Sequence, residues 1–188
     1  MPQGSRDARA AGSIAPMLSP DEAIDTIARG HREVHALLAG ISLEELDEPA
    51  TIGGGEWSAK DLVGHITTWE EIALATVEEW RAGEDPAILV TLAADGTDEL
   101  NADEVARKSG SQLEDQLARF DDVHRELTEV LSSLGGAEWT QAARDDREPA
   151  RSIGSLLGGV LGTDEHPFDH ISAHLRDLRA FSAPRAPG

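Results

Sequence analysis

One stretch of the chain, Gly162 to Phe181, reads GTDEHPFDHISAHLRDLRAF and decides how the rest is interpreted. Within it His170 and His174 are four residues apart, so a helix of 3.6 residues per turn places both side chains on one face. Apolar residues at helical spacing flank the pair, so we expect this face to point to the interior. These residues are Phe168, Ile171, Leu175 and Leu178. Two imidazoles one turn apart are typical of a metal-binding pair.

A pair needs at least one more ligand, and we expect His65 to supply it. His65 lies in a second helical pattern, which begins at Trp57 and reads WSAKDLVGHITTWEE. Three neutral imidazoles would leave coordination positions open for water or substrate, which distinguishes a catalytic metal site from a structural one. The alternative is that His170 and His174 are ordinary polar residues on a half-buried helix, since seven histidines in 188 residues make one such pair unsurprising.

The composition limits both the chemistry and the partners. The formal net charge is −20 at pH 7 and no basic cluster stands out, so we expect neither nucleic acid nor an anionic membrane as a partner. The absence of cysteine excludes disulfides, thiolate ligands and a cysteine nucleophile, so any metal must be held by His, Asp or Glu. No apolar run is long enough for a signal peptide or a membrane span, and we therefore expect a cytoplasmic protein.

The chain length suits one domain with a sizeable core. We expect an all-α four-helix bundle over residues 19–182, with flexible tails at 1–18 and 183–188 and a metal site near one end of the bundle. A homodimer formed through helix faces is compatible with this architecture.

Two helix starts are marked by capping signals. Ser19, Pro20 and Glu22 combine an N-cap, a proline at the first helical position and the acid that closes a capping box. Ser58 and Asp61 repeat the pattern. Glycines should close these two helices, at Gly40 and Gly83.

The middle of the chain predicts a crossover connection and a third helix. Residues 84–96 contain an apolar run, Ile88 to Val90, that a strand could use. The third helix has core positions alternating four and three residues apart: Leu113, Leu117, Phe120, His124, Leu127, Leu131 and Leu134. The stretch from Asn101 onward, weakened by Gly110, is either part of one kinked helix or a separate helix.

The fourth helix shows the same spacing from Ile153 to Leu178. Pro167 interrupts it, and proline in a helix interior removes a hydrogen bond. The sequence therefore predicts either one bent helix or a break at residues 162–167 with a new start.

Other histidines and one tryptophan are further candidates. His124 and His166 are possible acid/base residues, although His124 also suits a core position and His166 the entrance of the site. Trp69 lies one turn from His65 and is a candidate for the substrate pocket. His31 and His35 form a rival pair, ranked lower because nothing else in the first helix marks a site.

These motifs resemble those of DinB-like proteins, the superfamily that includes the maleylpyruvate isomerase N-terminal domains and the ClbS/DfsB group. The segment from Trp57 to His65, followed by Trp69-Glu70, is similar to the second helix of that family. The segment Phe168 to His174 is similar to its fourth helix, and within the family most like the single-domain ClbS/DfsB relatives. The resemblance implies a four-helix bundle in which His65, His170 and His174 bind a divalent metal such as zinc, nickel or iron.

The chain departs from the ClbS/DfsB pattern at Ile171, Ala173 and Pro167, which puts the substrate and the local geometry in doubt. The resemblance implies three possible functions. The first is a metal-dependent transferase or isomerase that uses a low-molecular-weight thiol on a small electrophile. The second is a hydrolase giving self-resistance to a toxic metabolite, and the third is a protein that binds a metal or small ligand without turnover. A thiol cosubstrate with an acidic headgroup would need cationic side chains at the mouth of the site, and the candidates are Arg144, Arg147 and Arg151. The alternative is that these arginines belong to a solvated loop and pair with acidic residues.

Overall fold

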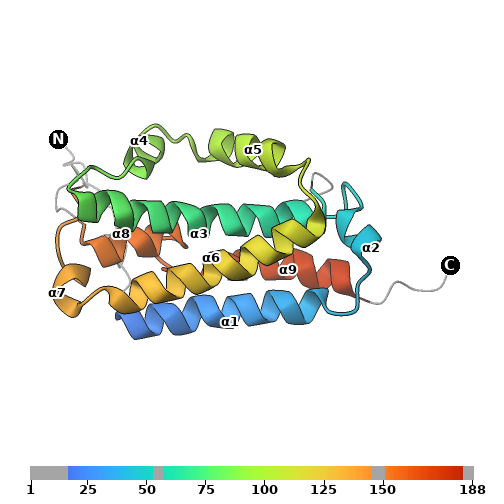
Figure 1. Ribbon diagram of the computed structural model, residues 1–188, viewed down its shortest axis with the longest axis horizontal. Coiled ribbons are helices and arrows are strands. Elements are labelled where there is room, and N and C mark those ends of the chain that lie inside the picture. Colours follow the sequence, from blue (N-terminus) through green and yellow to red (C-terminus); the bar gives the residue numbers. More distant parts are fainter. Residues whose placement is uncertain (1–16, 53–56, 145–150, 184–188) are drawn as a thin grey trace, which may run out of the picture.

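The computed structural model describes residues 17–52, 57–144 and 151–183, and it is a bundle of helices (Figure 1). Three long helices run side by side, and two shorter ones follow each other in the fourth position. The three are α1 (Pro20–Leu38), α3 (Ala59–Ala82) and α6 (Leu113–Ser133), and the two are α8 (Ile153–Val160) and α9 (His170–Ser182). The expectation of an all-α four-helix bundle is confirmed. Most of the two expected tails lies outside the described residues.

The helix starts follow the capping signals. Ser19 accepts a hydrogen bond from the backbone N–H of Glu22, whose carboxylate accepts one from the Ser19 N–H, and Ser58 and Asp61 repeat this arrangement. Gly83 closes α3 in the left-handed conformation, with φ 89°. A further capping box at Ser42 starts the short helix α2 (Leu43–Asp47). Helix α3, which carries His65, is therefore fixed at both ends by local chemistry.

The connection from α3 to α6 is helical, and the suggestion of a strand is wrong. It forms α4 (Ile88–Ala93) and α5 (Thr97–Lys108), which lie along the outer side of α3 (Figure 1). Ile88 is buried whereas Val90 is 75% exposed, so only one side of this apolar run faces the core. The described residues form no β-strand with which this run could pair. Their only β-type contacts are two isolated bridges. The chain turns at Gly110 between α5 and α6, which are two separate helices.

The fourth helix is broken before the histidine pair. Helix α8 ends at Val160, and α9 starts at His170 after a compact loop. Phe168 adopts a positive φ of 63° there, and its backbone N–H donates to the carbonyl of Gly158. A Cβ at Gly162 would lie only 2.8 Å from the backbone nitrogen of Phe168, so the loop closes tightly only because this residue is glycine. Of the two sequence alternatives, the structure has the break.

The apolar core is divided into two clusters, and histidines lie at the division. The division falls within each long helix: between Ile27 and Val34 on α1, between Ile66 and Trp69 on α3, and between Phe120 and Leu127 on α6. It falls between Phe168 and Ile171 at the start of α9. The histidines at or beside these breaks are His31, His65, His124 and His170. This polar layer crosses the bundle between the clusters, so the expectation of a site near one end is wrong.

Candidate metal centre

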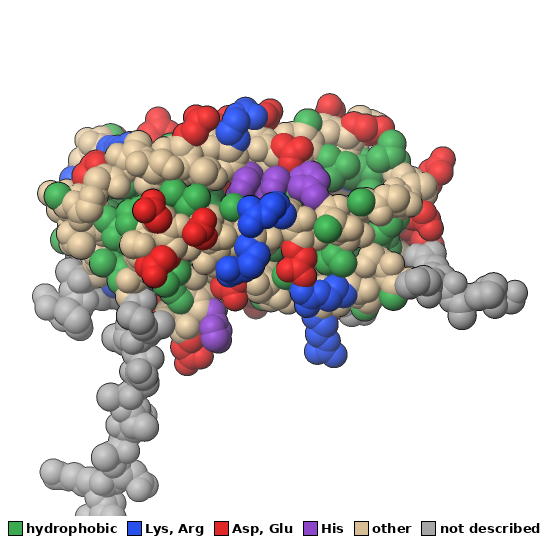
Figure 2. Space-filling model, turned by 90° about the horizontal axis from the view of Figure 1, so that it is seen from below, with side chains coloured by type: hydrophobic (Ala, Val, Ile, Leu, Met, Phe, Trp, Pro, Cys, Tyr) green, Lys and Arg blue, Asp and Glu red, His purple; other side chains and the backbone are tan. Residues whose placement is uncertain are grey.

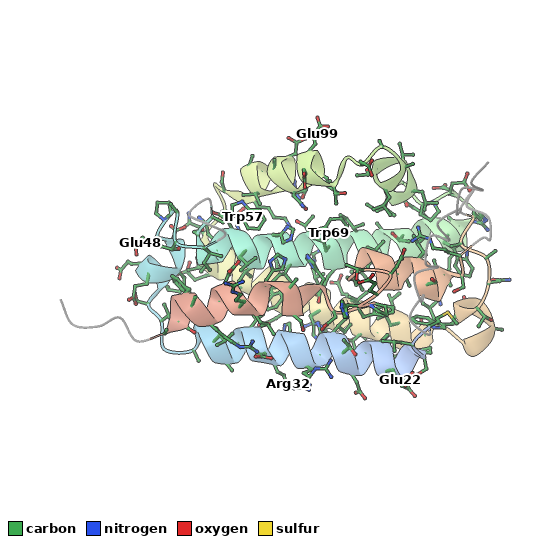
Figure 3. All side chains as sticks on the ribbon, turned by 180° about the vertical axis from the view of Figure 1, so that it is seen from behind. Glu22, Arg32, Glu48, Trp57, Trp69 and Glu99 are labelled. Atoms are coloured by element: carbon green, nitrogen blue, oxygen red, sulfur yellow. The ribbon has the colours of Figure 1, made fainter. Side chains whose placement is uncertain are left out.

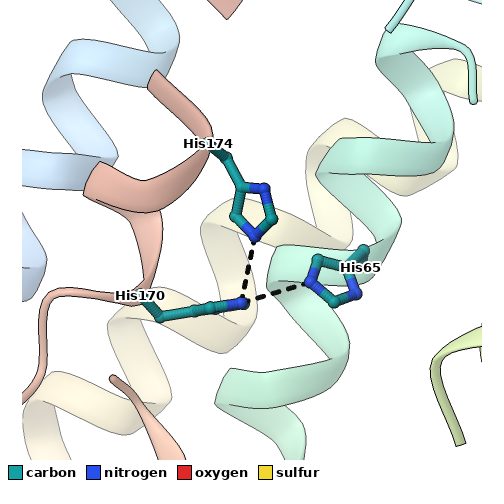
Figure 4. A group of neighbouring side chains, drawn as sticks. All are labelled: His65, His170 and His174. Atoms are coloured by element: carbon teal, nitrogen blue, oxygen red, sulfur yellow. Dashed lines mark hydrogen bonds between the residues drawn. The ribbon is translucent and has the colours of Figure 1, made fainter. Parts of the chain in front are cut away.

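Three histidine side chains from α3 and α9 meet inside the bundle. The Nε2 atom of His170 lies 3.2 Å from Nε2 of His65 and 3.1 Å from Nε2 of His174 (Figure 4). All three donor atoms lie within 4.8 Å of one another. Tetrahedral donors at metal–nitrogen distances of about 2.0–2.1 Å are separated by about 3.3 Å. The spacing of the imidazoles therefore fits one shared divalent ion.

The chemistry of these atoms supports the same interpretation. An imidazole Nε2 carries either a proton or a lone pair, so it is a donor or an acceptor but not both. His170 Nε2 faces two other Nε2 atoms, so it would share one proton between them as a donor or one lone pair between them as an acceptor. No carboxylate or hydroxyl among the described residues joins the three rings by a hydrogen bond. A cation that accepts three lone pairs satisfies all three atoms at once.

Burial keeps these imidazoles neutral. It lowers the pKa of His65 to about 3, with smaller electrostatic effects from His174 and Lys108. Burial also lowers the pKa of His170 well below its ordinary value, assisted by the two neighbouring histidines. The pKa of His174 is lowered by burial, partly opposed by Asp177. Metal ligation requires the unprotonated imidazole, so the three residues are ready ligands at neutral pH.

The surrounding residues hold the rings in place. His170 is the first residue of α9, and its backbone N–H donates to the carbonyl of Leu161 at 2.8 Å, which ties the start of α9 to the end of α8. Two indoles lie along this part of α3, Trp57 just before its first residue and Trp69 within it (Figure 3). The Trp57 ring is centred 4.9 Å from His65, and the Trp69 ring is centred 5.9 Å from His170. One wall of the site is therefore aromatic.

The structure brings together the three predicted ligands and Trp69, whose Nε1 donates to Asn101. It does not bring His124 to them: His124 Nδ1 contacts Glu70, and its ring stacks on His31. His166 is exposed in the loop before α9, where its backbone makes hydrogen bonds with Thr163 and Asp169 rather than with the three rings. Neither histidine is placed as an acid/base residue at this centre.

The arginine candidates are not at the centre either. Arg144 donates to the carbonyls of Trp80 and Glu84 at the far end of α3. Arg151 lies 3.8 Å from the carboxylate of Asp164, which is exposed rather than buried on the apolar line of the helix. Arg147 lies outside the described residues. Arg144 and Arg151 are therefore not placed to bind the acidic headgroup of a thiol at this centre.

Sequence reasoning missed a polar chain on the other side of the layer. Glu70 is buried, its Oε2 has no hydrogen-bond partner among the described residues, and burial raises its pKa. Its Oε1 lies 3.2 Å from His124 Nδ1, and the His124 ring stacks on His31. The position of Glu70 directly after Trp69 gave no signal, because its partner is on another helix.

The fold and this centre define a helical-bundle protein with a partly buried site of three histidines. The sequence matches the DinB superfamily over residues 26–171. The chain belongs to the DinB superfamily. A search of curated proteins finds no match.

Solved structures share the fold at low sequence identity. The colibactin self-resistance protein ClbS, in complex with double-stranded DNA, is 18% identical and has a TM-score of 0.63, over 88% of this chain and 98% of that one. A protein from Streptococcus pneumoniae is 11% identical, with a TM-score of 0.68 over 90% and 93%. An uncharacterised protein from Escherichia coli UTI89 is 16% identical, with a TM-score of 0.66 over 91% and 98%.

The exclusion of nucleic acid by net charge is wrong. The ClbS structure contains double-stranded DNA, so a protein of this fold has nucleic acid as a partner. Net charge is a property of the whole surface, whereas binding depends on local groups. Cations do gather locally here, where Arg107, Lys108 and Arg119 line a cavity of about 200 Å³ between α3, α5 and α6. Among the described residues, no helix has the length and apolar character to cross a membrane.

Proposed function

We propose that this protein is a metal-dependent enzyme that transfers a low-molecular-weight thiol to a small electrophile, or isomerises the thiol adduct. The observation that carries the proposal is the convergence of three neutral imidazole Nε2 atoms, with separations of 3.1 and 3.2 Å along the row. Three protein ligands leave at least one coordination position for a small molecule, which is the arrangement of catalytic zinc sites.

His65, His170 and His174 would hold the ion, which when bound would supply a Lewis acid that lowers the pKa of a water or a thiol. The indoles of Trp57 and Trp69 lie beside His65 and His170, and the indole of Trp69 would offer an apolar surface to an electrophile. In transfer by addition, the thiol sulfur forms a bond to the electrophilic carbon, the electron pair of the broken π bond moves to the neighbouring atom of the electrophile, and the thiol proton ends on that atom. The chain has no cysteine, so the thiol must be a cosubstrate.

The experiment is incubation of metal-loaded protein with a panel of thiols and electrophiles, followed by mass spectrometry. Transfer gives a product heavier than the electrophile by the thiol, whereas hydrolysis gives one heavier by water and proceeds without thiol. Because the protein contributes no thiol of its own, thiol loss measured with a colorimetric reagent reports only the cosubstrate. His65→Ala should abolish turnover, and His166→Asn, which removes an exposed histidine, should retain it.

Hydrolysis without thiol would replace the proposal by the alternative, a resistance enzyme of the ClbS type. Tight binding of metal or of a small ligand with neither product would favour a protein without turnover. Turnover that is unchanged in His65→Ala would remove the metal from the mechanism.

Double-stranded DNA is a second candidate ligand, supported by the DNA complex of ClbS and by the cations at the α3–α5–α6 cavity. Lys108 and Arg119 already contact Glu71, and Arg107 contacts Glu104, so phosphates would have to compete with carboxylates. Fluorescence anisotropy with a labelled duplex at about 50 mM salt tests this, because phosphate contacts weaken steeply as salt rises. Arg119→Glu should weaken binding of the duplex if the cavity is the contact surface. Absence of binding by the wild type would reject double-stranded DNA as a ligand.

A further inference from the structure

A second group of metal-ligating atoms lies between α1 and α6. The Nε2 atoms of His31 and His35 lie 3.2 and 2.6 Å from the same carboxylate oxygen, Oδ1 of Asp121. The three donor atoms lie within 4.8 Å of one another. Figure 2 shows histidine side chains gathered in a row on the face seen from below, the side on which α1 lies. None of these residues belongs to the centre between α3 and α9.

The inner ligand of this group is held rigidly. The His31 ring stacks on His124 at a centroid distance of 3.9 Å and an interplanar angle of 10°, and it packs on Phe120 at 4.4 Å. Its side chain is only 15% exposed, and its buried Nε2, although 3.2 Å from Asp121 Oδ1, makes no hydrogen bond of acceptable geometry within the described part of the chain. A buried imidazole nitrogen without a partner costs free energy, which a bound cation would remove.

The outer ligands are adjustable and open to solvent. The side chains of His35 and Asp121 are 45% and 52% exposed. The contact between His31 and Asp121 already matches the spacing of about 3.3 Å between tetrahedral donors, whereas the contact between His35 and Asp121 is shorter. A small rotation of the exposed Asp121 side chain lengthens it. Solvent access leaves room for water as the remaining ligand.

We propose that His31, His35 and Asp121 form a second binding site for a divalent transition-metal ion. Two imidazoles and one carboxylate suit zinc, nickel, cobalt or copper, whereas magnesium and calcium prefer oxygen ligands. The net charge of −20 favours cation accumulation near the surface. An ion at this site joins α1 to α6, and it contacts the stacked row that runs through His124 to Glu70 on α3.

The test uses the full chain without a histidine tag, stripped with a chelator and titrated with zinc by calorimetry. The first centre is removed by His170→Asn, so that its binding does not mask the second. This variant should bind one zinc ion. Adding Asp121→Asn should abolish that binding, whereas the neighbouring exchange Asp122→Asn should leave it, because Asp122 is paired with Arg125. His166→Asn is the control for loss of an exposed histidine.

Each outcome decides the proposal. Binding in His170→Asn that Asp121→Asn and His35→Asn each abolish supports it, and a cobalt spectrum that changes in the same variants adds a direct view of the ligands. Absence of zinc binding in His170→Asn overturns the site, as does binding that Asp121→Asn leaves unchanged. Zinc binding by the single variant Asp121→Asn, which retains His65, His170 and His174, tests the three-histidine centre separately. Circular dichroism verifies that every variant remains helical.

Discussion

The Nε2 atom of His65 on α3 lies 3.2 Å from the Nε2 atom of His170 on α9, although the two residues are 105 positions apart in the sequence. Neither helix holds this contact alone. The start of α9 is fixed by the loop from α8, and α3 is fixed by its caps, so the distance between the two imidazoles reports how well the whole bundle is assembled.

The first prediction concerns metal content. His65→Ala, His170→Ala and His174→Ala should each remove one equivalent of bound zinc or nickel, because two remaining imidazoles hold a divalent ion far more weakly than three. Elemental analysis of untagged protein measures this, and circular dichroism shows whether the helices persist. Full metal content in all three variants would contradict the assignment.

The second prediction concerns pH. Burial raises the pKa of Glu70 above its ordinary value of 4.5, so the folded state binds a proton more tightly than the unfolded state. The stability from this group is complete below pH 4.5 and is lost as pH rises through the folded pKa, by about 1.4 kcal/mol per pH unit. Glu70→Gln has no titrating group at this position. Its free energy of unfolding should therefore rise relative to that of the wild type as the pH increases over this window.

Denaturant unfolding of both proteins between pH 4 and pH 8 measures that difference. The informative quantity is how the difference in free energy of unfolding between the two proteins changes with pH. The amide group itself shifts this difference by an amount that does not depend on pH. A difference that stays flat over the whole range would mean that Glu70 has an ordinary pKa in the folded protein.

The third prediction concerns the loop that positions His170. Gly162→Ala should destabilise the protein by about 2 kcal/mol, because its Cβ would press against the backbone of Phe168 and Asp169. It should also weaken metal binding, since the start of α9 must shift. Gly110→Ala is the matched control, because nothing lies within 4 Å of its Cβ. Thermal unfolding and metal titration of both variants provide the comparison, and equal behaviour would argue against a strained loop.

The fourth prediction concerns the cap of α3. Ser58→Ala should reduce the free energy of unfolding by about 1 kcal/mol, because the backbone N–H of Asp61 loses its acceptor. Ser132→Ala, at an exposed position within α6, should change it by less than about 0.5 kcal/mol. Chemical denaturation distinguishes the two, and equal losses would show that the cap adds nothing.

Much of the architecture follows from local sequence. The capping boxes at Ser19 and Ser58 and the left-handed Gly83 place helix ends correctly, because each depends on residues within one turn. The four-residue spacing of His170 and His174 likewise fixes their common face. The apolar run at Ile88 suits a strand or a helix by its sequence alone, and only the packing surface decides for the helix.

By itself, the sequence determined the helix order, the capped ends and the common face of His170 and His174, and it predicted that His65 joins them. Only the tertiary structure decided that the histidines lie in one layer between two apolar clusters, that Glu70 pairs with His124, and that Asp121 joins His31 and His35. The physical reason is the separation along the sequence of the residues that interact. Hydrogen bonds within a helix connect residues four apart, whereas these contacts join different helices, and their geometry depends on the packing of every side chain between them.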